Sequence, residues 1–146
     1  MTITSHHPSW VFIDTGGYFG LASSKDEHHS EAVAIMNGLV SNHFRLFTSN
    51  FILAELHALL VNRVSRRTAL QTLTAIDNSS TTIIRVNQSD EQRARQILAQ
   101  YDDKNFSLTD AASFSIMDRL GISHAVSFDG HFEQYGKTVL TPGFFR

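Results

Sequence analysis

The sequence predicts an α/β fold in which a mostly parallel β-sheet is covered on both faces by helices. Short apolar segments rich in β-branched and aromatic residues alternate with longer segments of helical periodicity. This alternation is typical of strand–helix–strand units, whose right-handed crossovers lay the strands parallel to one another. About five strands are expected, at residues 10–13, 46–48, 82–86, 125–128 and 138–140.

Five helices are expected between these strands, at residues 28–41, 51–64, 66–76, 90–101 and 110–120. Ser89 and Gln92 have the spacing of a capping box at the start of the fourth helix. Thr109 has the place of an N-cap for the fifth helix, and Gly121 has the place of the residue that ends it. In the second helix apolar residues cover most of the circumference, so burial on more than one side is expected, by the sheet and by a partner chain.

The composition indicates a single globular domain over residues 1–146. Hydrophobic residues make up 42% and charged residues 18%, which is the range of folded domains, and we find no repeat or low-complexity linker. The absence of cysteine excludes a disulfide framework, a thiolate zinc site and a cysteine nucleophile. No signal peptide or membrane-spanning pattern is present, so a cytoplasmic protein without a membrane partner is expected.

Acidic residues stand where the predicted elements meet one edge of the sheet. Asp14 directly follows the first strand, in WVFID, and Asp129 directly follows the fourth, in AVSFD. Parallel strands direct their carboxyl ends to the same edge, where ligands bind in open α/β sheets. Glu55 lies in the first turns of the helix that leaves the second strand, and Asp110 in the first turn of its own helix. The four carboxylates are therefore expected to converge.

Four carboxylates in one cleft would repel one another unless a cation were present. Magnesium prefers oxygen ligands, and two such ions can stabilise the attacking and leaving oxygens of phosphodiester cleavage. The zinc patterns HExxH and CxxC are absent from the sequence. The net charge of −2 disfavours a nucleic-acid partner, but with four of the fourteen acids neutralised, ten would remain against twelve Lys and Arg. The rest of the surface would then be basic.

Four segments carry these acids: IDT at 13–15, TSNFILAEL at 48–56, SLTDAAS at 107–113 and SFDGHF at 127–132. In order, in spacing and in total length they resemble the acidic signatures of the PIN domain, in its VapC-like ribonuclease branch. The resemblance implies a three-layer α/β/α sandwich and a Mg²⁺- or Mn²⁺-dependent endoribonuclease, usually the toxin of a type II toxin–antitoxin pair.

The resemblance also assigns roles to residues. It implies that the acids hold the metal and that a metal-activated water cleaves RNA, leaving a 3′-hydroxyl and a 5′-phosphate; the acids are Asp14, Glu55, Asp110 and Asp129. The partners it implies are RNA, a cognate antitoxin and a second copy of the chain in a homodimer. Thr15 and Ser127 flank acids and are expected to hydrogen-bond metal-bound waters.

Glycines follow the first acid. Gly16 stands where the family often has Ser or Asn, which removes one polar contact. With Gly17 and Gly20 it matches neither GxGxxG nor GxxxxGK[ST], so tight turns and room for a substrate backbone are expected here.

Basic and aromatic residues near the predicted helix ends leave alternatives open. The segment RVSRR contains a cluster of three arginines, Arg63, Arg66 and Arg67. They could contact RNA phosphates, or they could be solvated basic residues that cap a helix end, and the sequence supports the two interpretations equally. The tail aromatics Phe144 and Phe145 are expected to dock onto the body of the protein or onto a partner.

Three further polar residues are expected to be structural. Asp118 follows Asp110 on the same helix and should lie on a solvated face or pair with a base such as Arg119. His131, in DGHF, should be a packed or capping histidine and not a general base. His57 should be a core or interface histidine.

Each acid taken alone also has a structural explanation. Asp110 could stabilise a helix start by about 0.3–1 kcal/mol, and Asp129 with Gly130 could form an ordinary turn. Glu55 fits such an explanation least, because an acid in an apolar helix is costly to bury without a partner or an ion. A single metal site accounts for all four acids together.

Two other functions were weighed. A non-catalytic PIN-like module that binds RNA or protein would keep the fold without cutting, but all four acids are present. A receiver-like or phosphatase domain would need a second acid after the first strand, and IDTGG has none.

Overall fold

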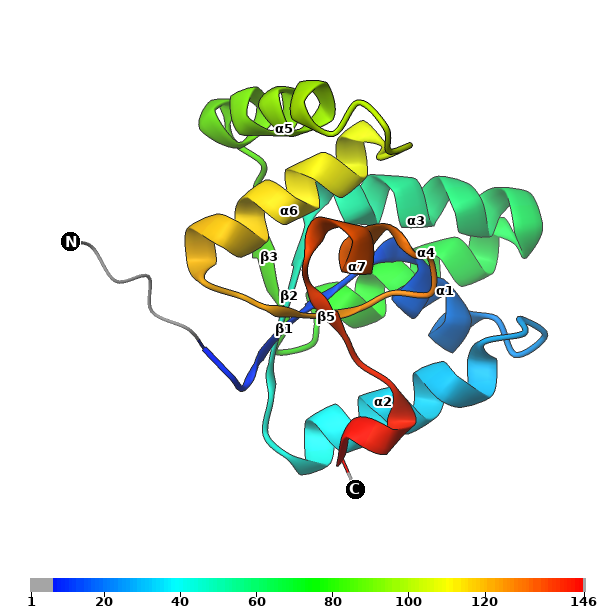
Figure 1. Ribbon diagram of the computed structural model, residues 1–146. Helices are drawn as coiled ribbons and strands as arrows, with labels where there is room; N and C mark the ends of the chain where they lie inside the picture. Colours follow the sequence, from blue (N-terminus) through cyan, green and yellow to red (C-terminus); the bar gives the residue numbers. More distant parts are fainter. Residues whose placement is uncertain (1–6, 146) are drawn as a thin grey trace.

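Within residues 7–145, which the computed structural model describes, five strands form one sheet in the order β3-β2-β1-β4-β5 (Figure 1). The central strand β1 (Trp10–Ile13) pairs in parallel with β2 (Arg45–Ser49) and with β4 (His124–Val126). The edges are β3 (Thr82–Ile84) and β5 (Thr138–Val139), also parallel to their neighbours. The predicted parallel sheet is confirmed.

Helices lie on both sides of this sheet, with α5 and α6 above it and α2 below it in the view of Figure 1. This arrangement confirms the expected three-layer fold. The helices are α1 (Thr15–Ala22), α2 (His29–Ser41), α3 (Asn50–Arg63), α4 (Arg66–Asp77), α5 (Gln88–Gln100), α6 (Leu108–Leu120), α7 (His131–Tyr135) and the short 3-10 helix η1 (Pro142–Phe145).

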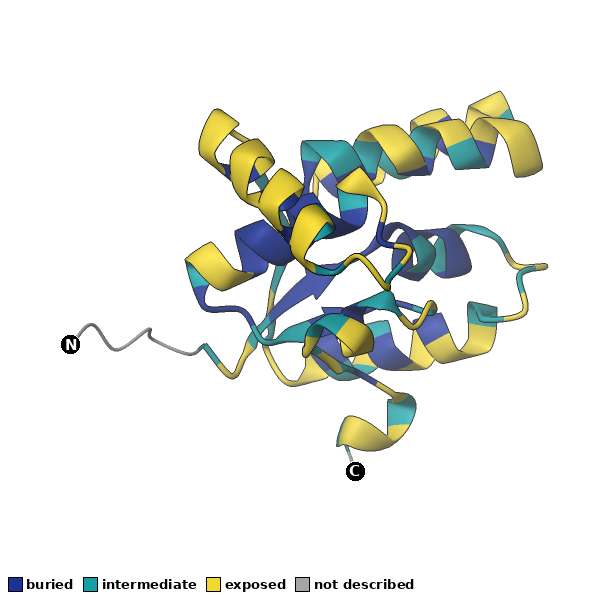
Figure 2. Ribbon diagram, turned by 45° about the horizontal axis from the view of Figure 1, so that its top comes forward, coloured by how far each residue is buried: buried dark blue, intermediate teal, exposed yellow. Residues whose placement is uncertain are grey.

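The core forms around β1. Val11, Phe12 and Ile13 are fully buried, as expected for a central strand with helices on both faces. In α6, every residue from 110 to 117 is buried, because this helix packs between the sheet and α5. Exposed residues follow the outer faces of α5 and α3 (Figure 2).

Residues 15–22 form helix α1, so the tight turns expected at its glycines are wrong. A Cβ atom on Gly17 would lie 3.0 Å from Val126 Cγ1 and 3.2 Å from Ile13 Cγ2. A Cβ atom on Gly20 would lie 3.1 Å from the Cβ of Ala32 in α2. The glycines thus let α1 pack closely on β1, β4 and α2, which outweighs the low helix propensity of glycine.

Helix α6 begins earlier than predicted. Its N-cap is Ser107 and not Thr109, and Ser107 forms a capping box with Asp110. Asp110 is therefore the third residue of the helix. The helix ends as predicted at Gly121, whose φ of 73° is left-handed.

Helix α5 also begins earlier, and the predicted box of Ser89 with Gln92 is wrong. The N-cap is Asn87, whose side chain accepts from the backbone N–H of Asp90, while the Asp90 carboxylate accepts from the Asn87 N–H. Two successive helices therefore begin with an Asp at the same position.

Helix α3 has one buried stripe, formed by Ile52, Leu56 and Leu60. Glu55 is exposed and Val61 is 37% exposed, so the described chain itself buries one side of this helix, and burial of a second side by a partner chain stays a prediction. The helix turns a single apolar stripe toward the core.

The tail aromatics dock onto the body of the protein, which was one of the two predicted outcomes. Phe145 lies against Gly38 of α2, where a Cβ atom would come within 2.3 Å of the ring carbon Cδ2. Both Phe144 and Phe145 make edge contacts with Phe44.

Strand β4 ends at Val126, two residues earlier than predicted, and α7 follows at His131. Asp129 therefore lies in the turn between these elements and not at the last position of the strand. No helix of residues 7–145 is long and apolar enough to cross a membrane.

Candidate metal centre

Asp14 is held between β1 and α1, where the close packing of α1 on the sheet buries it to 4% exposure. Its backbone N–H donates to Val126 O on the neighbouring strand, and its Oδ2 accepts from Ser127 Oγ at 2.9 Å. Burial, and then the charge of Asp129, raise the pKa of Asp14 from 3.8 to about 7. Donors on Thr15 and Ser127 lower it, and Asp110 adds a further upward contribution.

Asp110 is 7% exposed at the start of α6. Its Oδ2 accepts two hydrogen bonds, from Ser107 N at 3.0 Å and from His131 Nδ1 at 2.8 Å. The first bond is the capping box and the second crosses to α7. Both donors act on one oxygen of this carboxylate.

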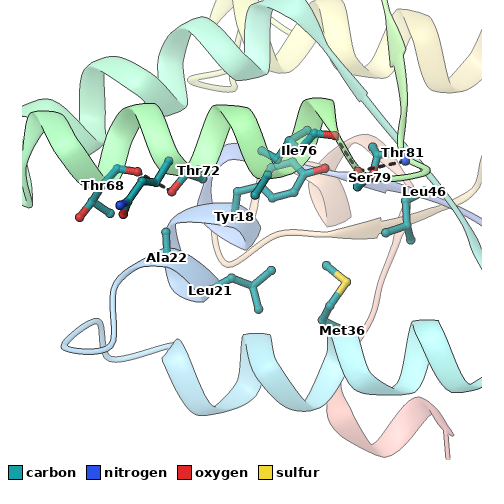
Figure 3. A pocket seen from close by; sticks show the side chains of 12 residues that line it. Tyr18, Leu21, Ala22, Met36, Leu46, Thr68, Thr72, Ile76, Ser79 and Thr81 are labelled. Carbon is teal, nitrogen blue, oxygen red and sulfur yellow. Dashed lines mark hydrogen bonds between the residues drawn. The ribbon is translucent and has the colours of Figure 1, made fainter.

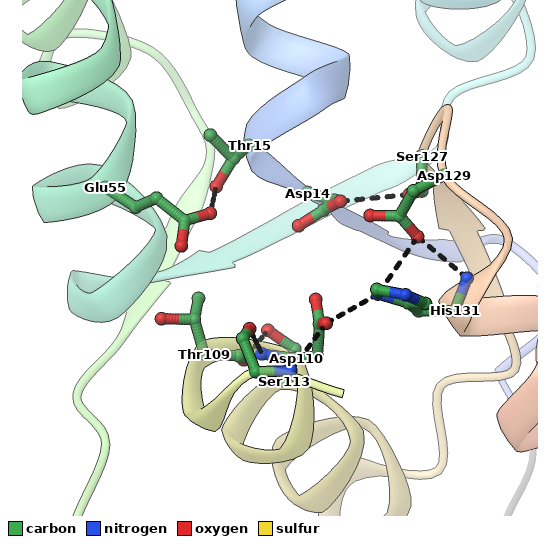
Figure 4. A network of polar contacts seen from close by, with 10 residues as sticks. Asp14, Thr15, Glu55, Thr109, Asp110, Ser113, Ser127, Asp129 and His131 are labelled. Carbon is green, nitrogen blue, oxygen red and sulfur yellow. Dashed lines mark hydrogen bonds and ion pairs between the residues drawn. The ribbon is translucent and has the colours of Figure 1, made fainter. Parts of the chain in front are cut away.

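Asp129 lies in the turn before α7, and its side chain is 45% exposed. Its Oδ1 accepts from the backbone N–H of His131 at 2.8 Å. One ligand atom from each of Asp110, Asp129 and His131 lies within 4.8 Å of the others. The helix start and the turn thus bring two acids and an imidazole together, as Figure 4 shows.

Glu55 lies outside this closest group of three. Its carboxylate is on the exposed side of α3, contrary to the expected burial, and its Oε1 accepts from Thr15 Oγ1 at 2.7 Å. In Figure 4 the Glu55 carboxylate is directed from α3 toward the space beside Asp14. Thr15 and Ser127 each donate to one of the acids, Thr15 to Glu55 and Ser127 to Asp14.

The carboxylates keep oxygens available for a cation. In each of Glu55, Asp110 and Asp129, only one of the two carboxylate oxygens accepts a hydrogen bond from the described residues. The other oxygen has no protein donor; it is Oε2 of Glu55, Oδ1 of Asp110 and Oδ2 of Asp129. No Lys or Arg of residues 7–145 forms an ion pair with any of the four acids. Carboxylate oxygens that no Lys or Arg neutralises fit a hard divalent cation.

His131 is the residue of this site whose contact the sequence did not reveal. The expected packing is present, because its ring meets Phe106 edge-on with centroids 5.7 Å apart. The bond from Nδ1 to Asp110 was not predicted. This bond joins α7 to α6, and its two residues are too far apart in the sequence for a local pattern to predict their contact.

This chain is similar to known proteins over most of its length. No family model matches it. The VapC ribonuclease of Archaeoglobus fulgidus is 34% identical over 125 residues, which cover 84% of this chain and 78% of that protein. The chain belongs to the VapC family of PIN-domain proteins.

A second VapC relative is the 23S rRNA-specific endonuclease VapC20 of Mycobacterium tuberculosis. It is 29% identical over 132 residues, covering 90% of this chain and 98% of VapC20. The crystal structure of VapC20, described as a sarcin-ricin loop cleaving toxin, superposes with a TM-score of 0.84 at 28% identity, covering 90% and 99% of the two chains. The DNA-bound VapBC of Salmonella typhimurium shares the fold, with a TM-score of 0.63 at 16% identity over 89% of this chain and 96% of that chain.

The arginines of RVSRR lie elsewhere in this VapC chain, at the junction of α3 and α4. The guanidinium of Arg63 lies 6.0 Å from the ring centre of Phe19. Arg66 and Arg67 line a cavity with Leu70. None of the three forms an ion pair with any of the four acids within the described residues.

Asp118 lies beyond the buried part of α6. It accepts from Lys137 Nζ at 2.6 Å and from the Tyr135 hydroxyl at 2.5 Å, so the expected pairing with a base is confirmed, with Lys137 in place of Arg119. Burial, and then the bond to Asp118, raise the pKa of Tyr135.

A cavity of about 510 Å³ opens between α1, α2 and α4 (Figure 3). Its lining is mostly apolar and includes Leu21, Met36 and Ile76. Tyr18 also lines it, and burial raises the pKa of Tyr18 to about 12. None of the four acids lines this cavity.

Proposed function

We propose that this chain is a metal-dependent endoribonuclease, active as one domain over residues 1–146, whose Mg²⁺ or Mn²⁺ is held by Asp14, Glu55, Asp110 and Asp129. The observation that carries the proposal is the state of Asp14, which is buried beside Asp129 and Asp110 with a pKa raised to about 7. A cation bound beside Asp14 would offset both the burial of its charge and the repulsion from Asp129 and Asp110, so cation binding would stabilise the folded chain. Membership in the VapC family supports the same chemistry.

The chemistry that a bound divalent cation supplies is positive charge beside the scissile phosphate and a more acidic water. The residues of the chain prepare the carboxylates. Ser127 holds one oxygen of Asp14, and Thr15 holds one oxygen of Glu55. Fixed carboxylates lose little conformational freedom when they bind a cation, which favours affinity.

RNA is the substrate we infer, and the cytoplasm is the proposed location. VapC20 is named for cleavage of 23S rRNA and of the sarcin-ricin loop, which makes that stem-loop the first RNA to test here. The arginine cluster at residues 63–67 would contribute phosphate contacts, since no ion pair engages its Arg63, Arg66 or Arg67 within the described residues.

An antitoxin is the proposed regulatory partner, and a homodimer the proposed assembly. VapBC complexes among the structures that share the fold support a partner of this kind. The apolar cavity between α1, α2 and α4 has the chemistry to receive an apolar helix of such a partner.

The test is cleavage of the sarcin-ricin loop and of total RNA by the purified chain, with and without EDTA, with mapping of the cut ends. We expect cleavage that EDTA stops, excess Mg²⁺ or Mn²⁺ restores, and Asp14→Asn abolishes while the circular-dichroism spectrum stays unchanged. Asp118→Asn is the matched control, because Asp118 pairs with Lys137 away from the site, and it should cut normally. Undiminished cleavage by Asp14→Asn or in EDTA would refute the proposal. RNA binding without cleavage would favour the non-catalytic module.

A further inference from the structure

His131 joins the two acidic segments that the sheet alone does not connect. Its backbone N–H donates to Asp129 Oδ1 at 2.8 Å, and its ring Nδ1 lies 2.8 Å from Asp110 Oδ2 (Figure 4). Asp129 belongs to the turn after β4 and Asp110 to the start of α6. One residue therefore sets the separation of two proposed metal ligands.

The direction of the ring bond follows from the chemistry of its acceptor. A carboxylate offers only acceptor atoms, so Nδ1 carries the hydrogen and donates it to Asp110. The ring is held by its edge contact with Phe106, itself 8% exposed, and by the start of α7. Nδ1 is thus a fixed donor.

Asp90 supplies an internal comparison. Like Asp110 it is the third residue of its helix and closes a capping box. Arg119, however, donates from Nε to Asp90 Oδ1 at 3.0 Å and from Nη2 to Oδ2 at 2.9 Å, so both oxygens and the charge are used. A capping acid with a purely structural role can therefore be fully paired in this protein.

Asp110 is arranged differently. His131 and Ser107 donate to the same oxygen, Oδ2, and Oδ1 has no donor among the described residues. A second donor on an oxygen that is already capped adds little to the helix start but prevents rotation of the carboxylate. This is the arrangement expected when the other oxygen must face a ligand.

We propose that His131 is a positioning residue, which fixes the Asp110 carboxylate through Nδ1 so that Oδ1 is presented to the metal together with the free oxygen of Asp129. The inference rests on the proposed function. It assigns His131 to the metal site through Asp110, without contact to the cation.

The experiment compares three variants of the full chain. His131→Phe keeps an aromatic ring against Phe106 and removes the donor. His131→Asn places an amide N–H at the position of Nδ1, and His131→Gln carries its amide one carbon further out. Because the bond to Asp129 comes from the backbone, all three variants can retain it.

The first readout is Mn²⁺ affinity without RNA, measured from the electron paramagnetic resonance signal of free Mn²⁺. We expect His131→Phe and His131→Gln to weaken binding about tenfold or more, and His131→Asn to stay within about threefold of the parent chain. The control His57→Gln, on α3, should bind as the parent does. In cleavage assays, the Mn²⁺ concentration for half-maximal rate should rise by the same factor, with the KM for RNA unchanged.

Equal affinity of the Phe variant and the parent would overturn the inference, as would loss of affinity in the Asn variant, which is expected if the imidazole bound the metal directly. If the Phe variant does not fold, the Mn²⁺ affinities of the Asn and Gln variants decide: weaker binding by the Gln variant alone supports the inference, and equal binding overturns it. A parent chain that binds no Mn²⁺ would overturn the inference and the proposed function together. A parent that binds Mn²⁺ with all variants equal would overturn the inference alone.

Discussion

Asp90 and Asp110 occupy the same position in two successive helices, and only Asp90 is neutralised by an arginine. Both close capping boxes, and both are nearly buried, at 2% and 7% exposure. Asp90 gives both oxygens to Arg119, whereas Asp110 receives a histidine on the oxygen that already caps the helix. Asp90 therefore holds two helices together, whereas Asp110 keeps one oxygen available for a ligand.

The Asp90–Arg119 ion pair should contribute to the stability of the fold and have no role in metal binding. Arg119→Met leaves a buried carboxylate without its partner, and the free energy of unfolding should fall by about 2–3 kcal/mol, given that Arg119 is itself partly exposed. Urea unfolding measures this loss. Arg95→Met, on an exposed position of the same α5 helix, should change it by less than about 0.5 kcal/mol. Equal effects of the two substitutions would contradict the assignment.

The metal-free chain should lose stability as the pH rises from about 4 to about 7. The folded state raises the pKa of Asp14 from 3.8 to about 7, so it holds the proton more tightly than the unfolded state does. The contribution of Asp14 is fully present below about pH 4 and is lost as the pH rises through about 7, on the order of 4 kcal/mol in all.

Unfolding in EDTA at pH 4 and pH 8 measures most of that loss. The Asp14→Asn chain is the reference, since it cannot ionise at this position, and the difference between the two chains isolates Asp14. Added Mg²⁺ should restore the free energy of unfolding of the parent chain at pH 8 and leave that of the variant unchanged. Parallel pH profiles of parent and variant would show that Asp14 does not titrate in this range.

Gly17 and Gly16 should respond oppositely to alanine. A Cβ atom on Gly17 would lie 3.0 Å from Val126 Cγ1 and 3.2 Å from Val126 O, so Gly17→Ala should push α1 from the sheet and cost about 1–3 kcal/mol. A Cβ atom on Gly16 would have its nearest neighbour at 3.8 Å, so Gly16→Ala should be neutral or gain up to about 1 kcal/mol of helix stability. Thermal unfolding of the two variants decides; a destabilising Gly16→Ala would count against this packing.

The arginine cluster should act on RNA binding alone. The triple change of Arg63, Arg66 and Arg67 to Glu should raise the KM for RNA about tenfold and reduce its salt dependence, with kcat unchanged, because none of the three forms an ion pair with the acids among the described residues. Arg95→Glu is the single-site control on the far helix. An unchanged KM would leave the cluster as solvated helix ends.

Much of the fold follows from patterns that act over short distances. The strand at residues 10–13 has the same bounds in the structure, because an unbroken apolar run is typical of a strand buried on both faces. Asp14 and Asp129 reach the same edge because β1 and β4 are parallel, which the alternation of strands and helices predicted; that the two strands are neighbours is a finding of the structure. Asp110 was expected at the start of its helix, but the capping box that Ser107 forms with it was missed, because Thr109 was taken as the N-cap.

The residues that were mispredicted depend on how elements pack. Helix α1 has three glycines in eight residues, and it is the close approach to Ile13 and Val126 that favours Gly17 there and the approach to Ala32 that favours Gly20. Glu55 was expected to be buried because its neighbours in sequence are apolar, but the sheet covers only one stripe of α3. The contact of His131 with Asp110 depends on the placement of α7 against α6, and no periodicity carries that information.

The pairing of β1 with β4 also makes the proposed centre depend on two segments that lie far apart in the sequence. Asp14 follows β1 and Asp129 follows β4, so their carboxylates share one edge only after these two strands have paired. A chain whose sheet has not formed therefore carries scattered acids and no assembled centre. Formation of the sheet and assembly of the proposed centre are thus a single event.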